Sequence, residues 1–301
     1  MRAALSDRDG IRMNLRQFSL LVLLSAIWGS SFMFIRLTVG DFGAVPLTAS
    51  RSLIGACTLV PLLLLKNQWS LFVRHWPHLL VIGLISTALP FSFLSISTQY
   101  TSAGFASILN ALTPVFSAVI AWLWLSEALT LAAMTGIALS FAGLVIMVLD
   151  RDTISASFPL LPVLAGIGAT LMYGLTGNYS RKFMVGVPPL VVAAGSQVFA
   201  SLALAPLALW LWPATTVPAL DWLWVAVLGV LCTGVAYIIY FHLLATVGVA
   251  RTVIVTYLAP VFAMLWGFLF LQEVATLKML AGAGAIMLGI GLTTYKPGTA
   301  R

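Results

Sequence analysis

The feature that most constrains this chain is a succession of long apolar runs separated by short polar gaps. A helix needs roughly 20 predominantly apolar residues to cross the hydrocarbon core of a bilayer. The runs are continuously apolar rather than alternating, which favours helices over a β-barrel. We therefore predict an all-α integral membrane protein with ten transmembrane helices, at residues 18–37, 46–65, 78–98, 104–125, 131–149, 160–180, 189–211, 220–245, 250–271 and 277–295.

The composition agrees with lipid as the solvent. Apolar residues make up 61% of the chain and charged residues only 8%, against about 25% charged residues in a soluble domain. The net charge of +7 is spread over the gaps between the runs rather than gathered on one face, which argues against nucleic acid as a partner. Cys57 and Cys232 both lie inside apolar runs and have no metal-ligand or disulfide spacing. We expect no metal ion and no cofactor.

The positive charges instead predict an orientation. With the N-terminus inside, the inner segments carry eleven Lys and Arg residues and the outer segments three. This bias follows the positive-inside rule. The tails at residues 1–17 and 296–301 are therefore expected in the cytoplasm.

An internal repeat is the most informative pattern in the sequence. Gly104–Gly143 and Ala250–Gly289 align without gaps at an offset of 146 residues, with twelve of 40 positions identical. Leucine-rich bias explains matched leucines but not the matched Pro, Glu, Thr and Gly residues. We predict two five-helix repeats, at residues 18–149 and 160–295. Because five is odd, the second repeat enters the membrane inverted, which is the architecture of alternating-access transporters.

Several motifs carry a resemblance to a known family. Trp28-Gly29-Ser30-Ser31-Phe32, Arg51, and Ala106-Ser107-Ile108-Leu109 leading to Pro114 are among them, as are the Leu-x-Glu-x-x-Thr ends at Leu125–Thr130 and Leu271–Thr276. With them, nearly the whole chain resembles the EamA-type branch of the drug/metabolite transporter superfamily. Within it, the chain is similar to bacterial inner-membrane exporters of amino acids, including aromatic ones. The resemblance implies a transporter rather than an enzyme, located in the bacterial inner membrane. It also implies that the first, third, fourth, sixth, eighth and ninth spans line the pathway.

Aromatic residues of those spans are candidates for the substrate site. An aromatic-walled pocket with a few polar tips suits apolar or aromatic amino acids. The alternative for each residue is an ordinary lipid-facing position. Trp28 and Tyr173 stand out because they are repeat counterparts and each precedes a glycine. The candidates are Trp28, Phe91, Tyr100, Tyr173, Tyr237 and Tyr257.

Three prolines are predicted hinges. A proline inside a helix leaves the carbonyl four residues earlier without its donor. For Pro114 and Pro260 these carbonyls belong to Asn110 and Thr256, which we take as substrate contacts. Pro90 frees a carbonyl in the third span but has no proline counterpart in the eighth span, where Gly234 is expected to make the helix flexible instead. Ordinary structural kinks are the alternative.

Ionisable groups inside spans are the remaining candidates. Arg51 is a possible clamp for a substrate carboxylate, or it snorkels, or it pairs with Asp41 or Glu273. His242 is a candidate substrate contact or proton carrier. Glu127 and Glu273 stand at helix ends, where a structural role is favoured. No Asp or Glu lies in the middle of a span, which disfavours proton-coupled drug antiport.

Other functions remain as alternatives to amino-acid export. A drug or other metabolite exporter shares the architecture. A sugar-phosphate or nucleotide-sugar carrier needs several cationic side chains in its cavity, and only Arg51 qualifies. A membrane enzyme needs a nucleophile–base pair or a metal site, and three scattered histidines supply neither. The glycine-rich last span packs either against the fifth span of the same chain or against a second copy, and we expect a monomer.

Overall fold

The computed structural model describes residues 13–149 and 160–294, and every regular element in that part of the chain is helical. Most of the predicted N-terminal tail, the segment 150–159 and the predicted C-terminal tail lie outside the described residues. The first half contains α1 (Leu15–Phe42), α2 (Ala44–Leu65), α3 (Trp69–Arg74), α4 (Trp76–Gly83), the π-helical segment η1 (Leu84–Ala88), α5 (Leu89–Tyr100), α6 (Ala103–Ala111), α7 (Thr113–Leu125) and α8 (Leu131–Val148). The second half contains α9 (Leu160–Phe183), α10 (Pro189–Trp210), α11 (Ala219–Gly229), the π-helical segment η3 (Val230–Val235), α12 (Ala236–Val247), α13 (Val249–Thr252), α14 (Ile254–Leu271) and α15 (Leu277–Thr294).

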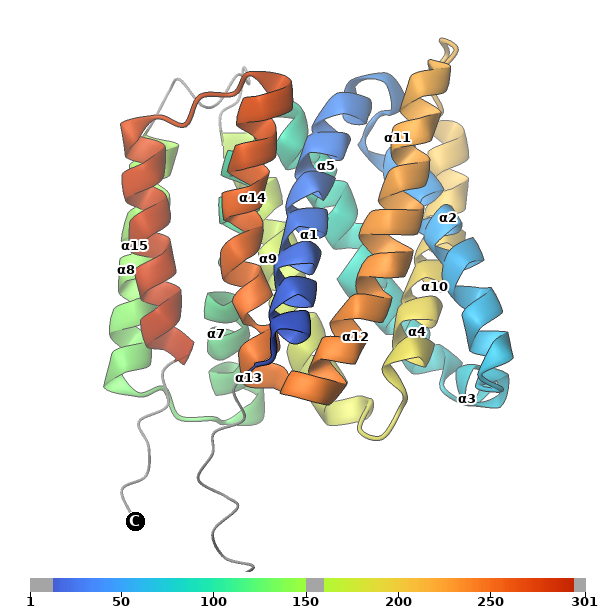
Figure 1. The fold of residues 1–301 in the computed structure, drawn as a ribbon, viewed down its shortest axis with the longest axis horizontal. Helices are drawn as coiled ribbons and strands as arrows, with labels where there is room; N and C mark the ends of the chain where they lie inside the picture. The colour runs from blue at the N-terminus through green and yellow to red at the C-terminus, as the bar shows by residue number, and fades with distance from the viewer. Residues whose placement is uncertain (1–12, 150–159, 295–301) are drawn as a thin grey trace, which may run out of the picture.

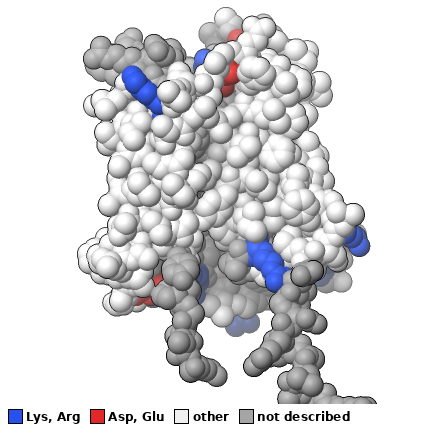
Figure 2. All heavy atoms as spheres, turned by 60° about the vertical axis from the view of Figure 1, so that its left-hand side comes forward, with Lys and Arg blue, Asp and Glu red and all other residues white. Residues whose placement is uncertain are grey.

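These elements form ten helical segments in the described residues that are long and apolar enough to cross a membrane. The prediction of ten spans is confirmed, and each span begins within four residues of its predicted start. Figure 2 shows the charged side chains of one face near its two ends, with a broad uncharged band between them. Such a band matches the hydrocarbon core of a bilayer.

The two halves run in opposite directions. The link between α7 and α8 lies at the lower end of the bundle in Figure 1, whereas its repeat counterpart between α14 and α15 lies at the upper end. The start of α1 and the end of α15 both lie at the lower end. The predicted inverted five-helix repeats are therefore present.

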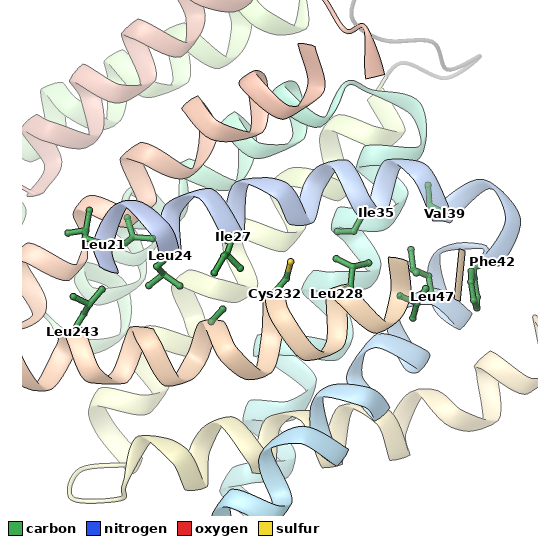
Figure 3. Close-up of a cluster of buried hydrophobic side chains, with 13 residues drawn as sticks. Leu21, Leu24, Ile27, Ile35, Val39, Phe42, Leu47, Leu228, Cys232 and Leu243 are labelled. Carbon is green, nitrogen blue, oxygen red and sulfur yellow. The ribbon is translucent and has the colours of Figure 1, made fainter. Parts of the chain in front are cut away.

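The first helix packs along the eighth span over most of its length. Figure 3 shows Leu21, Leu24 and Ile27 of α1 facing a row of side chains on α11, η3 and α12. The same row continues to Val39 and Phe42, which are 1% exposed. Because these end residues are buried in the core, α1 continues to Phe42, beyond its predicted end at residue 37.

The fifth and tenth spans form a close pair within one chain. A Cβ atom added to Gly143 of α8 would lie 2.6 Å from the carbonyl oxygen of Gly282 in α15. Small residues allow helix backbones to approach this closely in membranes. Gly282 and Gly289 of α15 therefore lie against α8 of the same chain.

The three prolines predicted as hinges lie in different local conformations. Pro90 lies in the first turn of α5, directly after η1, and the corresponding eighth span carries η3 at the same place in its repeat. Pro114 lies in the first turn of α7, after a break at Leu112, while Pro260 lies inside the continuous helix α14. The two prolines are equivalent in sequence but not in local conformation. π-helical insertions of this kind are frequent at functional sites.

Candidate functional site

A cavity of about 320 Å³ lies between the two halves, near the middle of the spans. Its volume falls within the range of roughly 300–1,000 Å³ typical of small-molecule pockets. Trp28 stands at the centre of α1, and Thr233 stands at the centre of the eighth span. The lining residues are Trp28, Ser31, Phe32, Ile35, Arg51, Phe91, Leu94, Ser107, Asn110, Ala111, Thr113, Tyr173, Cys232, Thr233, Tyr237, Tyr240, Thr256, Ala259 and Pro260.

Aromatic rings form much of the wall. The centroids of Trp28 and Tyr240 lie 5.3 Å apart, and those of Phe91 and Tyr173 lie 6.5 Å apart. Each pair joins a helix of one half to a helix of the other. The wall therefore depends on how the two halves sit against each other.

Two glycines place the rings of Trp28 and Tyr173. A Cβ atom on Gly29 would lie 2.7 Å from the carbonyl oxygen of Ala259 in α14, and one on Gly174 would lie 2.8 Å from the amide nitrogen of Ser117 in α7. α1 thus crosses α14 as closely as α9 crosses α7. Because each aromatic residue precedes its glycine, the close crossing holds both rings at mid-membrane depth.

Arg51 supplies the charge of the cavity. Its side chain extends from α2, and the residue is 5% exposed. Nε donates a hydrogen bond to Thr233 Oγ1 at 3.2 Å, and Cζ lies 4.0 Å from the centroid of the Phe91 ring. The structure therefore shows neither snorkelling nor, among the described residues, an ion pair with Asp41 or Glu273.

A related bond occurs in the other half. Gln197 of α10, the helix that corresponds to α2, donates from Nε2 to Thr87 Oγ1 at 3.4 Å. Thr87 and Thr233 lie 146 residues apart, within the two π-helical segments. Gln197 is fully buried and does not line the cavity. Each half thus holds the π-helical segment of the other through one polar side chain.

Many of the residues predicted from sequence do come together. Those that line the cavity are Trp28, Arg51, Phe91, Asn110, Tyr173, Tyr237, Thr256 and Pro260. Asn110 Oδ1 is buried without a hydrogen-bond partner in the described part of the chain. The main-chain carbonyl of Asn110 accepts the Thr113 hydroxyl at 2.8 Å, so this carbonyl is not free as predicted.

Two predicted contacts lie elsewhere. His242 is exposed on the outer face of α12 and does not line the cavity. Tyr257 points toward α15, where its hydroxyl lies 3.1 Å from Thr294 Oγ1. Successive residues of an α-helix are rotated by about 100°. His242 therefore faces away from Tyr240, and Tyr257 turns away from Thr256.

Tyr240, Thr233 and Ser31 also line the cavity but were not among the residues predicted from the sequence. Thr233, Tyr237 and Tyr240 follow the spacing of one helix face, which predicts that all three line the cavity if one of them does. Pro90, Pro114 and Tyr100 do not line it. Among the described residues, no group of three His, Cys, Asp or Glu side chains is arranged to hold a metal ion.

Ion pairs join the halves at the two ends of the bundle. Glu273 pairs with Arg36 at 3.9 Å, and its carboxylate accepts the Ala103 amide at 2.9 and 3.2 Å. Burial raises the pKa of the Glu273 carboxyl, against the lowering effect of the Ala103 amide and Arg36. At the other end Glu127 pairs with Arg181.

The two ion pairs are repeat counterparts. Glu127 and Glu273 lie 146 residues apart, and Arg36 and Arg181 lie 145 apart, the offset that also relates Trp28 to Tyr173. In each pair the arginine comes from one half and the glutamate from the other. The inverted repeat places one pair at each end of the bundle.

Comparisons with known proteins agree with this architecture. The chain is 25% identical to an uncharacterized transporter, YvbV, of Bacillus subtilis (strain 168), over 92% of this chain and 91% of that one. It is also 25% identical to a probable terminal-alkyne amino-acid exporter of Streptantibioticus cattleyicolor, over 90% and 91% of the two chains. A solved crystal structure that is 19% identical covers 94% of this chain and 97% of its own, with a TM-score of 0.65, and shares the fold.

Residues 16–149 and 160–295 each match the EamA-like transporter family. These two stretches contain the two five-helix repeats, the cavity between them and both ion pairs. The chain therefore belongs to the EamA-like transporter family and is a multi-pass membrane transporter.

Proposed function

We propose that this transporter exports small organic metabolites by alternating access, with neutral apolar and aromatic amino acids as its first substrates. The observation that carries the proposal is a central cavity between the two halves, together with a repeat-related ion pair that joins the halves at each end of the bundle. In such an architecture one half rocks against the other around a fixed site. Breaking one pair while the other holds opens the cavity to one side at a time.

The chemistry of the cavity supports the substrate class. Aromatic rings and small hydroxyls make most of its wall, and Arg51 is the one Lys or Arg among the described residues that line it. A nucleotide-sugar or sugar-phosphate carrier needs more positive charge for its phosphates. The amino-acid exporter named for Streptantibioticus cattleyicolor adds support at 25% identity.

The substrate contacts follow from this proposal. We assign them to Trp28, Phe91, Asn110, Tyr173, Tyr237 and Thr256, with Arg51 as the charged contact. Pro260 remains a hinge candidate because it interrupts the hydrogen bonding of α14 next to the cavity.

We also propose the membrane in which the protein resides, the orientation of its termini and its oligomeric state. The excess of Lys and Arg in the segments predicted inside orients both termini toward the cytoplasm of a bacterium, in its inner membrane. The close pairing of α8 with α15 supports a monomer.

Uptake of labelled phenylalanine and methionine into proteoliposomes, with and without a pH gradient, tests the proposal. We expect saturable flux that does not depend on the gradient. Trp28→Ala should reduce it, whereas Trp210→Ala should leave it unchanged, because Trp210 is 81% exposed and does not line the cavity. Flux of a cationic dye driven by the pH gradient, with no amino-acid flux, would instead identify a drug antiporter.

A further inference from the structure

The Arg51 guanidinium is a buried cation whose protein partners are all neutral. Its Nε donates a hydrogen bond to the Thr233 hydroxyl, and the Phe91 ring covers one face of the guanidinium plane. The two Nη atoms have no hydrogen-bond partner in the part of the chain that the structure describes. A buried charge without a counter-charge is strongly unfavourable in a protein interior. This arrangement leaves the Nη edge of Arg51 ready for an anion.

The acidic side chains that sequence reasoning offered to Arg51 are engaged elsewhere. Glu273 is bound to Arg36 and to the Ala103 amide at one end of the bundle. Asp41 is exposed and lies beside Asp221. No Asp or Glu is found among the described residues that line the cavity. Among the described residues, no acidic side chain therefore supplies a counter-charge to Arg51.

Comparison with the other half separates the charge from the structural bond. Gln197 makes the related contact to Thr87 with a neutral amide. A neutral side chain is thus sufficient to tie a π-helical segment to the facing helix. The charge of Arg51 lies on the cavity side, whereas fully buried Gln197 does not reach the cavity. The positive charge therefore serves something other than helix packing.

We propose that Arg51 binds the carboxylate of apolar or aromatic organic acids, and that an α-ammonium group is not needed for recognition. A guanidinium edge with two free nitrogens matches a carboxylate bidentately. A monoanion neutralises the single positive charge of the lining. The ammonium of a zwitterion finds only neutral acceptors there, such as the unpartnered Oδ1 of Asn110. The proposal rests on the proposed function, because it takes this cavity as the substrate site.

Three ligands that share a phenylethyl skeleton test the charge preference on the wild-type protein. They are 3-phenylpropionate, which has only the carboxylate, L-phenylalanine, which has both charges, and 2-phenylethylamine, which has only the ammonium. Binding to the purified full chain is measured by calorimetry. We expect 3-phenylpropionate to bind at least as tightly as phenylalanine, and 2-phenylethylamine to bind at least about tenfold more weakly, since a lost bond to a charged group has this effect. Equal binding of 2-phenylethylamine, or phenylalanine binding about tenfold more tightly than 3-phenylpropionate, would overturn the proposal.

Arg51→Gln gives the second arm, because Gln197 shows that glutamine can make the structural bond. This variant should lose at least about tenfold in affinity for 3-phenylpropionate while keeping its affinity for the uncharged 3-phenylpropan-1-ol. Gln197→Ala is the matched control and should leave the carboxylate affinity unchanged. If Arg51→Gln does not fold, the ligand series on the wild type still decides.

The outcomes also separate this proposal from the proposed function. If amino acids are transported and Arg51→Gln binds 3-phenylpropionate as tightly as the wild type, carboxylate recognition by Arg51 is wrong and the carrier function stands. If neither amino acids nor 3-phenylpropionate bind or move, both proposals fail.

Discussion

At one end of the bundle Glu273 pairs with Arg36, and at the other end its repeat counterpart Glu127 pairs with Arg181. The surroundings of the two glutamates differ. The Glu273 side chain is 18% exposed and also accepts the amide that begins α6, whereas the Glu127 side chain is 50% exposed. Arg36 in addition donates to the carbonyl oxygen of Thr98 at 3.3 Å.

The helices that precede these glutamates also differ, in where each is interrupted. The fourth span runs as α6 from Ala103 to Ala111 before it breaks at Leu112, close to the cavity. The ninth span is the continuous helix α14, and the short helix α13 precedes it, separated from it at Val253. Two copies of one sequence pattern thus hold two local conformations. This is what an alternating-access protein requires, because each state is asymmetric and the other state exchanges the roles of the halves.

The close helix crossings should be equal in the two halves, and substituting their glycines gives the largest effect. Gly29→Ala and Gly174→Ala each force a methyl group against a facing backbone. We expect each to lower the free energy of unfolding by about 1–3 kcal/mol, as overpacking of a core does. Titration of the purified protein with SDS measures the loss.

Gly284→Ala is the control, because nothing lies within 4 Å of a Cβ atom added there. It should change stability by less than about 0.5 kcal/mol. If Gly174→Ala were as harmless as Gly284→Ala while Gly29→Ala was not, the two crossings would not be equivalent.

The two glutamates should differ in their contribution to stability. Glu273→Gln weakens charge-assisted bonds to a helix start and to Arg36 in a partly buried site, and we expect a loss of about 1–2 kcal/mol. Glu127→Gln removes an exposed ion pair, which is worth about 0–1 kcal/mol. The same SDS titration, run at low and high salt, gives both values. Equal losses, or a larger loss for Glu127→Gln, would show that the Glu273 end is not the more tightly held one.

The spans could be predicted from the sequence because a lipid bilayer allows few backbone structures to cross it. A membrane-spanning helix must satisfy its own backbone hydrogen bonds and needs about 20 apolar residues to cross the hydrocarbon core. The positions of Lys66, Asp150 and similar polar residues between the runs therefore determine where the spans end. The inverted repeat was equally accessible, since Glu127 and Glu273 match at a constant offset. The cavity residues that were found, such as Trp28 and Tyr173, were identified by this repeat.

The rest depends on which way each helix faces. The sequence of a span that is apolar on all sides does not indicate which face of the helix points toward the cavity. His242 was therefore predicted as a cavity residue and Tyr240, two residues away, was not. The π-helical segments were also not predictable. They form where Gly83 and Gly229 lie against the facing helices of the other half, and that contact exists only in the folded bundle. Sequence equivalence likewise could not show that Pro114 begins a helix while Pro260 lies inside one.

Two distances, one across each end of the bundle, test alternating access most directly. Spin labels at Leu37 and Val274 report on the Glu273 end, and labels at their repeat counterparts Lys182 and Ala128 report on the Glu127 end, in chains whose Cys57 and Cys232 are replaced by alanine. Pulsed electron spin resonance is recorded in bilayers with and without a saturating transported ligand. Alternating access predicts that when one distance lengthens the other shortens. Two distances that lengthen together, or that both stay fixed while solute moves, would contradict it.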